Sequence, residues 1–352
     1  MQRAFFAFVT VMLLVATGSA QAQSRIKIAT LVPENSAWGS QMKAARDEIK
    51  ERTDGRVKLH FYWGGVQGSG DPATVKKMIR IGQLHGGDFT PTDFQDKLPD
   101  LNIYGLPFVF ESLDEVNYVR KQMDQTLADG LTKEGFVTFG FAGDFAIILS
   151  SVPVRGLADL KGRKVWLPEG DKISDRAMKK LQLVPNSQPV ADVLVGLKTG
   201  LFDVVTMPAG AAVALQLHTA VKYFTDMPVI YAMQFLAIQD KVFNKLSPED
   251  QAVAREVLTR AYANIDAQVP ADAANAKEAL ANNGIESVTP NDGEFKQIAD
   301  LMAANNRDMA KQGMYSLDLL ELMQQHIDDY RATQAAERAA ASTDEVVLAG
   351  KQ

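Results

Sequence analysis

Few residues in this sequence stand at spacings that could support chemistry. The four histidines, His60, His85, His218 and His326, are scattered, and neither an H-E-x-x-H zinc motif nor a G-x-S-x-G nucleophile motif is present. The glycine-rich stretch at 64–70 lacks the Lys-Ser or Lys-Thr ending of a phosphate-binding loop. Because the chain has 43 acidic residues, paired carboxylates identify no particular site. We therefore expect no catalytic residues, no metal site and no cofactor.

Composition narrows the class of protein further. The absence of cysteine removes disulfides, thiol catalysis, iron–sulfur clusters and cysteine-ligated zinc. A length of 352 residues favours two domains, and a hydrophobic content of 46% is typical of a globular protein. The formal net charge of −6 argues against a nucleic-acid partner, because an acidic protein repels phosphate backbones.

The first residues have the features of a secretory signal. Arg3 precedes an apolar stretch at 4–16, and Ala20 and Ala22 provide the small residues that a signal peptidase reads. We expect residues 1–22 to be a signal peptide cleaved after Ala22, with an uncleaved anchor helix as the alternative. No later stretch reaches the roughly 18 apolar residues that a transmembrane helix needs. The mature chain is expected to be exported and not embedded in a membrane.

The elements that must position any site follow an α/β pattern. An apolar strand at 25–31 leads to a helix that Ser36 can cap, and residues 57–63 alternate like a strand with one buried face. A helix from Pro72 then completes a strand–helix–strand–helix order, which favours a parallel sheet. Further strands are expected at 136–141, 146–150, 164–167 and 202–205, and further helices at 113–132, 173–181 and 190–197.

The last third of the chain is predicted to be mainly helical. Ser247 and Pro248 open a long helix as its cap and first residue, and Pro270 could kink or divide it. Residues 332–352 are rich in alanine and show no convincing core face, so we expect them to form a tail.

Five segments together resemble a known family. Their order and spacing, over about residues 25–330, are similar to those of the periplasmic receptors of TRAP transporters, the tripartite ATP-independent systems often labelled dicarboxylate receptors. The segments read IKIATLVPENSAWG, YGLPFVFESLDEV, DLKGRKVWLPEGD, LKTGLFDVV and KVFNKLSPEDQ.

The resemblance implies a two-domain clamshell with discontinuous domains. Lobe I would comprise residues 23–143 plus about 232–273, and lobe II residues 144–231 plus about 274–331, followed by the tail at 332–352. Such a receptor is not an enzyme: it holds a small organic ligand between its lobes in the periplasm and delivers it to TRAP-type membrane permease subunits. A sensory receptor on the same fold, and less favourably a periplasmic enzyme, are the alternatives.

Three positions depart from the family pattern. Most family members bind a carboxylate through an arginine, and this sequence has Trp166 at that position, two residues before Pro168. Phe145 stands near a second family arginine, and Met207 stands where an asparagine is common. A buried carboxylate needs a charged partner or several donors, whereas an indole offers one N–H.

This replacement predicts an unusual ligand. Apolar and aromatic walls suit a hydrophobic or aromatic ligand, and the nearby acid Glu169 would also suit a cationic group. Core packing is the alternative for Trp166, and a solvated turn is the alternative for Glu169. Asp171 is expected to cap a helix.

Three further aromatic residues are weaker candidates for ligand contact. Trp38 lies just inside the first helix, where family members often place a ligand-facing residue, but its spacing also fits the buried helix face. Tyr231 and Phe235 fall near the probable return of the chain between the lobes, and for these two packing is favoured over ligand contact.

Overall fold

Ten strands form one mixed sheet in the computed structural model, which describes residues 23–64 and 72–349. The strands are β1 (Ser24–Thr30), β2 (Val57–Trp63), β3 (Gly86–Phe89), β4 (Phe136–Thr138), β5 (Ala142–Ser150), β6 (Lys164–Pro168), β7 (Val184–Gln188), β8 (Val204–Pro208), β9 (Tyr223–Gln239) and β10 (Glu286–Val288). Their order across the sheet is β2-β1-β3-β9-β5-β8-β6-β7, and β4 and β10 each pair with β9.

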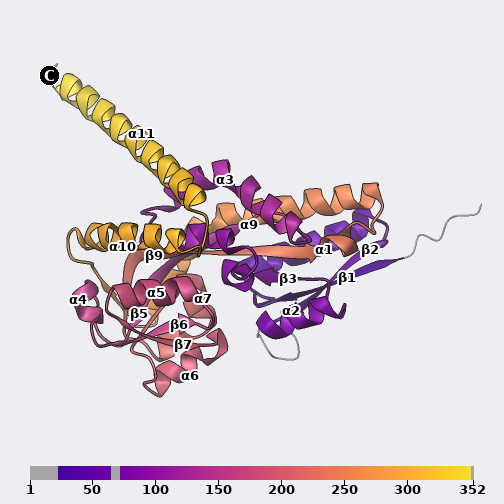
Figure 1. The fold of residues 1–352 in the computed structure, drawn as a ribbon, viewed down its shortest axis with the longest axis horizontal. Helices are drawn as coiled ribbons and strands as arrows, with labels where there is room; N and C mark the ends of the chain where they lie inside the picture. Colours follow the sequence, from indigo (N-terminus) through magenta and orange to yellow (C-terminus); the bar gives the residue numbers. More distant parts are fainter. Residues whose placement is uncertain (1–22, 65–71, 350–352) are drawn as a thin grey trace, which may run out of the picture.

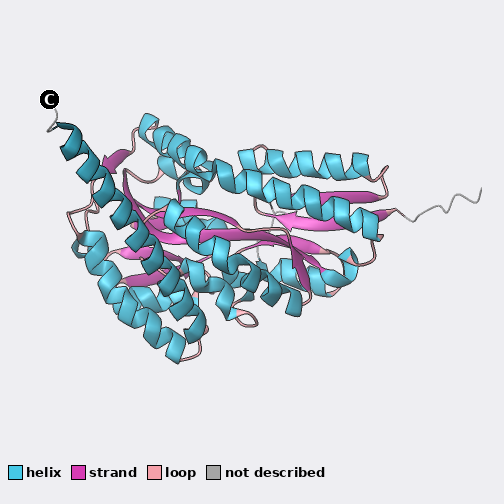
Figure 2. Cartoon of the chain, turned by 90° about the horizontal axis from the view of Figure 1, so that it is seen from above, coloured by secondary structure: helices cyan, strands magenta, loops and turns pink. Residues whose placement is uncertain are grey.

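Helices cover both faces of this sheet (Figure 1, Figure 2). The α-helices are α1 (Ala37–Arg52), α2 (Pro72–Arg80), α3 (Leu113–Lys133), α4 (Leu157–Leu160), α5 (Lys172–Lys180), α6 (Val193–Lys198), α7 (Ala209–Ala214), α8 (Asp240–Phe243), α9 (Pro248–Asn282), α10 (Glu294–Lys311) and α11 (Leu317–Ala349). Short 3-10 helices are η1 (Pro91–Phe94), η2 (Pro99–Gly105), η3 (Val190–Asp192) and η4 (Leu217–Thr219).

The first lobe is built on the parallel strands β1, β2 and β3. Its α1 begins as predicted, because the side chain of Ser36 accepts a hydrogen bond from the backbone N–H of Gly39 at 3.0 Å. The apolar side of α1 (Met42, Ala45 and Ile49) packs with the first half of α9 over one face of these strands. A Cβ atom at Gly39 would overlap the carbonyl oxygen of Pro33, so glycine allows the loop after β1 to fold tightly against α1.

The second lobe contains β5, β6, β7, β8 and β10. Strand β6 is parallel to β7 and β8, whereas β5 and β8 are antiparallel. Helices α6 and α7 cover one face of these strands, and α4, α5 and α10 cover the other. The central strands β6 and β8 are therefore covered on both faces and are mainly apolar, whereas β7 at the sheet edge is more polar and partly exposed.

Two long elements pass from one lobe to the other. Strand β9 pairs antiparallel with β5 from Tyr223 to Gln234 and antiparallel with β3 from Phe235 to Ile238. Helix α9 contributes to the cores of both lobes, and Pro270 does not divide it. The expected parallel sheet is wrong in this respect, because the chain returns between the lobes as an extended strand rather than through a helical crossover.

Helix α11 extends away from the rest of the molecule toward the C-terminus (Figure 1). The stretch predicted as a tail continues this helix as far as Ala349, and its side chains are mostly exposed from 332 to 340. Among residues 23–64 and 72–349, no helix is both long and apolar enough to cross a membrane. The predicted signal peptide and most of the glycine-rich stretch lie outside the described residues, and the residue limits predicted for the two lobes remain a prediction.

Candidate functional site

The carboxyl ends of β1, β2 and β3 bring polar and aromatic side chains to one edge of the first lobe. Thr30 pairs with Trp63 across β1 and β2, and Asp88 lies near the end of β3 on the other side of β1. Alternate residues of a strand share a face, so these three side chains point to the face that α1 and α9 cover. In open α/β folds, ligands bind outside the carboxyl ends of the parallel strands.

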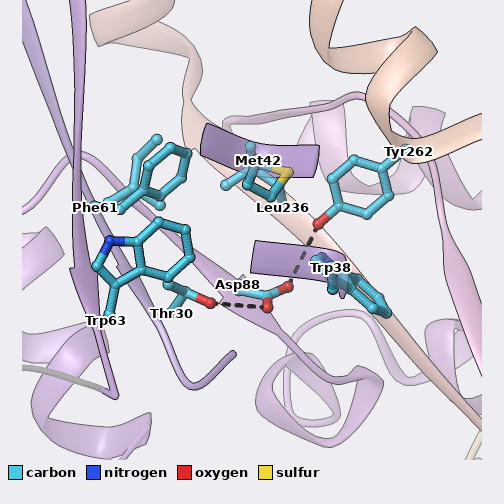
Figure 3. A pocket seen from close by; sticks show the side chains of 9 residues that line it. Thr30, Trp38, Met42, Phe61, Trp63, Asp88, Leu236 and Tyr262 are labelled. Carbon is cyan, nitrogen blue, oxygen red and sulfur yellow. Dashed lines mark hydrogen bonds between the residues drawn. The ribbon is translucent and has the colours of Figure 1, made fainter. Parts of the chain in front are cut away.

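Asp88 occupies the centre of a small pocket at this edge (Figure 3). Its Oδ2 accepts a hydrogen bond from Thr30 Oγ1 at 3.2 Å, and its Oδ1 accepts a longer one from Tyr262 Oη at 3.4 Å. Burial among these side chains raises the pKa of Asp88 to about 7; the two hydrogen bonds oppose that rise, and the negative charge of Asp93 adds to it. The carboxyl group therefore titrates near neutral pH.

Aromatic rings form much of the pocket wall. Trp38 packs edge-on against Tyr262 with ring centroids 6.0 Å apart, and Phe61 lies 5.0 Å from Trp63. Figure 3 shows Trp63 on one side of the Asp88 carboxylate and Trp38 on the other. The enclosed volume is about 10 Å³ and is completed by Ile28, Met42 and Leu236.

The two lobes touch beside this edge. Lys172, the first residue of α5, forms an ion pair with Asp96 at 2.7 Å, and Gln95 donates a hydrogen bond to the backbone oxygen of Gly170. Asp171 caps α5 as predicted, because its side chain accepts from the N–H of Ser174. The loop between β6 and α5 therefore faces the segment after η1 of the first lobe.

Two of the predicted ligand-facing residues lie together in the second lobe. Trp166 is 3% exposed and Met207 is 5% exposed, and both belong to the apolar cluster beneath α6 and α7. The indole N–H of Trp166 donates to the backbone oxygen of Gln188 at 3.0 Å. This burial agrees with the packing alternative, and ligand contact by these two side chains stays a prediction.

Three other predicted residues belong to a second cluster, between the sheet and α3. Tyr231 and Phe235 are fully buried there, whereas Phe145 is partly exposed and packs edge-on against Tyr231 with centroids 6.0 Å apart. The hydroxyl of Tyr231 accepts a hydrogen bond from Arg120 at 2.9 Å. Of these three residues, Phe145 retains surface that a ligand could reach.

The last two predicted residues are separated from both clusters. Trp38 lines the Asp88 pocket, and Glu169 is exposed after β6. The seven predicted residues therefore share no single described pocket, and only Trp38 lies in the enclosed one.

Comparison with known proteins assigns the chain to a family. The family model for bacterial extracellular solute-binding protein, family 7, matches residues 28–312. The chain belongs to this family. The 2,3-diketo-L-gulonate-binding periplasmic protein of Escherichia coli is 25% identical to this family 7 protein over 285 residues, which cover 78% of this chain and 84% of the relative. The sialic acid-binding periplasmic protein of Vibrio cholerae is 20% identical over 261 residues, covering 72% and 78%.

Solved structures support the fold of this family 7 protein. A TRAP periplasmic solute-binding protein of Ralstonia eutropha, solved with bound (S)-2-acetolactate, has a TM-score of 0.79 and 20% identity, covering 87% of this chain and 99% of that one. A Bordetella pertussis extracytoplasmic solute receptor that binds pyroglutamic acid has a TM-score of 0.78 and 20% identity, with the same coverage. The two-lobed α/β fold predicted from the sequence is confirmed by these structures, and the predicted solute-binding class is confirmed by the family model.

Sequence reasoning missed most of the Asp88 pocket. Asp88, Thr30, Trp63 and Tyr262 come from four separate elements, and only Trp38 was singled out. One signal was present in the sequence: Asp88 is an acid between Gly87 and Phe89, in the short strand β3, whose other residues are buried. A charged residue at the end of a buried strand indicates a polar partner or a site.

Proposed function

We propose that this family 7 protein is the exported receptor of a TRAP-type transporter, which captures a small organic solute between its lobes in the periplasm and delivers it to the membrane permease subunits. Family membership and the two-lobed fold support this proposal. The names of its relatives mention sugar acids, and those of the similar solved structures mention smaller organic acids, so a solute in this range of size is expected.

The ligand assignment rests on one observation, that the indole N–H of Trp166 is already used in a hydrogen bond. Its single N–H already donates to Gln188, so the position of the family arginine offers no free donor to a carboxylate. Met207 and Phe145, at the two other anchor positions, are apolar. We therefore propose a ligand with an apolar or aromatic body and not a C4-dicarboxylate, because two carboxylates would lack charged partners at these positions.

Calorimetry tests this assignment directly. A thermal-shift screen across aromatic acids, aliphatic acids, amines and neutral metabolites first finds the best ligand, since a ligand that binds the folded state raises its stability. Its affinity is then compared with those of succinate and malate. Tight succinate binding would contradict the apolar assignment and would require an arginine elsewhere to hold the carboxylate.

Uptake measurements separate transport from the alternatives. Deletion of the permease genes should abolish uptake of the ligand, and the protein should release that ligand chemically unaltered. A signalling response that survives permease deletion would favour the sensory receptor, and an altered product would favour an enzyme.

A further inference from the structure

We propose that Asp88 anchors a primary ammonium group of the transported solute, with the aromatic side chains around it as the wall of the ammonium site. This inference rests on the proposed function, because it names the polar group that a receptor without the family's arginine would recognise. Four observations support it: the geometry of the carboxylate, the aromatic surroundings, the lack of a positive partner and the size of the space.

The carboxylate of Asp88 has acceptor capacity to spare. Each oxygen accepts one hydrogen bond, from Thr30 at 3.2 Å and from Tyr262 at 3.4 Å. An ionised carboxylate has about four acceptor sites, so about two remain available. An ammonium group has three N–H donors and no acceptor, and it can fill both sites at once.

The walls of the pocket suit a positive charge. Trp38, Trp63 and Tyr262 lie around Asp88 in Figure 3, and the ring of Phe61 packs against that of Trp63. The face of an aromatic ring attracts a cation, tryptophan most strongly, and the attraction increases when water is excluded. An anionic ligand group in the same place would instead meet the carboxylate of Asp88, which would repel it.

Asp88 has no positively charged partner among the described side chains. Across residues 23–64 and 72–349, no lysine, arginine or histidine forms an ion pair with Asp88. The titratable groups that act on it are Tyr262, which donates a hydrogen bond, and the acidic Asp93, which repels its negative charge. The raised pKa of Asp88 is the consequence of burial without a counter-ion, and a bound ammonium group would supply one.

The size of the pocket restricts the type of cation. A volume of about 10 Å³ accommodates roughly one water-sized group. A primary ammonium is of that size, whereas a trimethylammonium group is much larger. We therefore expect primary amines to bind and their trimethylated derivatives to bind weakly or not at all.

The test is a thermal-shift and calorimetric screen of the full mature protein near pH 8. The probes are primary amines and amino acids ranging from ethylamine to 2-phenylethylamine in size. Each amine is measured beside the alcohol or acid that lacks the amine, and beside its trimethylated form. At least one primary amine should raise the melting temperature while its counterparts do not.

Three variants test whether amine binding depends on the Asp88 pocket. Asp88→Asn should weaken the amine at least about 10-fold, the scale for losing hydrogen bonds to a charged group. Asp47→Asn makes the same chemical change at an exposed carboxylate of α1 and should leave the affinity unchanged. Trp63→Leu keeps the carboxylate and removes a ring, and it should weaken binding about 2- to 30-fold. This second variant keeps the test valid if Asp88→Asn does not fold.

The outcomes separate this inference from the proposed function. If no amine binds, or if amine binding is equally strong in Asp88→Asn and Trp63→Leu, the ammonium site is wrong and the pocket holds no more than a water molecule. Binding of an acid or a neutral solute in that case would leave the receptor function standing. If no probe of any class binds and permease deletion does not affect uptake, the proposed function itself fails.

Discussion

The indole nitrogen of Trp166 lies 3.0 Å from the backbone oxygen of Gln188, to which it donates a hydrogen bond between β6 and β7. The hydrogen bond holds the ring against the apolar cluster of the second lobe and uses the only polar group that the side chain has. Trp166, which stands at the position of the family's ligand-binding arginine, is thus also part of the core.

Substitutions of Trp166 should therefore affect stability first. Trp166→Ala should lower the free energy of unfolding by about 3–5 kcal/mol, the range for removing a large core aromatic. Trp166→Phe keeps most of the packing but leaves the Gln188 oxygen without its partner, which costs about 1–3 kcal/mol. Urea denaturation measures both values.

A comparison within the same cluster shows whether Trp166 also contacts the ligand. Leu149 is buried in that cluster, and Leu149→Ala supplies a destabilised control. If Trp166 touches the ligand, Trp166→Phe should weaken binding more than Leu149→Ala does under conditions where both proteins are folded. Equal affinities would leave Trp166 with a packing role alone.

The stability of the protein should depend on the ionisation of Asp88. Its pKa is about 7 in the folded state against an ordinary value of 3.8 for an aspartate, so the folded state binds this proton more tightly. The contribution to stability is present below about pH 4, falls as the pH rises, and is lost above about pH 7. Asp88→Asn should therefore raise the melting temperature, relative to the native protein, more at pH 8 than at pH 5.

An exposed aspartate provides the control for this pH effect. The hydrogen bond from Arg46 lowers the pKa of Asp47, so Asp47→Asn should not stabilise the protein at pH 8. An identical effect of Asp88→Asn at both pH values would mean that Asp88 does not titrate in this range.

Breaking the buried ion pair between Arg120 and Asp266 should destabilise the fold. Arg120 Nη1 lies 2.8 Å from Asp266 Oδ1 on α9, and the guanidinium also donates to Asp124 and to the backbone oxygen of Phe141. Arg120→Met leaves these acceptors without their partner, and we expect a loss of about 3–5 kcal/mol.

The surface provides a matched pair for comparison. Arg52 also pairs with a carboxylate of α9, Glu256 at 2.8 Å, but both side chains are well exposed. Arg52→Met should cost far less stability than Arg120→Met, because an exposed ion pair contributes little. If the two variants lose the same stability in urea denaturation, burial is not what makes the Arg120 pair important.

Ligand binding should close the lobes. Small-angle scattering should show a smaller radius of gyration at saturation, because the lobes draw together around the ligand. The ion pair between Lys172 and Asp96 joins the lobes at 2.7 Å, so Lys172→Glu should favour separation and weaken binding a few-fold, the scale of an exposed pair. Lys179→Glu on the same helix disrupts only the local pair with Asp175 and should not alter ligand affinity. No change in radius at saturation would argue against closure.

The mature protein should begin at Gln23. Cleavage after Ala22 leaves β1 complete, since that strand starts at Ser24. Mass spectrometry of periplasmic protein measures the N-terminus, and Ala22→Leu should block cleavage because the peptidase needs a small residue there. Recovery of native protein with Met1 to Ala22 intact would refute this prediction.

The elements that the sequence determined are those with local causes. Ser36 and Ser247 cap α1 and α9. In each case the serine side-chain oxygen accepts a hydrogen bond from the backbone N–H three residues later, and this contact forms wherever the helix lies in the fold. The alternation at 57–63 and the order of strands and helices likewise led to the α/β class and, with the family resemblance, to the receptor fold.

Tertiary structure alone decided the mixed sheet and the Asp88 pocket. The direction in which β9 pairs with β3 and β5 depends on how the chain returns between the lobes, which no local pattern records. Asp88 and Tyr262 are 174 residues apart and meet only because α9 packs over the first-lobe strands. Burial also differs between two of the predicted site residues: Phe145 remains partly exposed, whereas Trp166 is enclosed in the core. Local periodicity specifies which face of an element is apolar, but the partner of that face is set by packing over the whole chain.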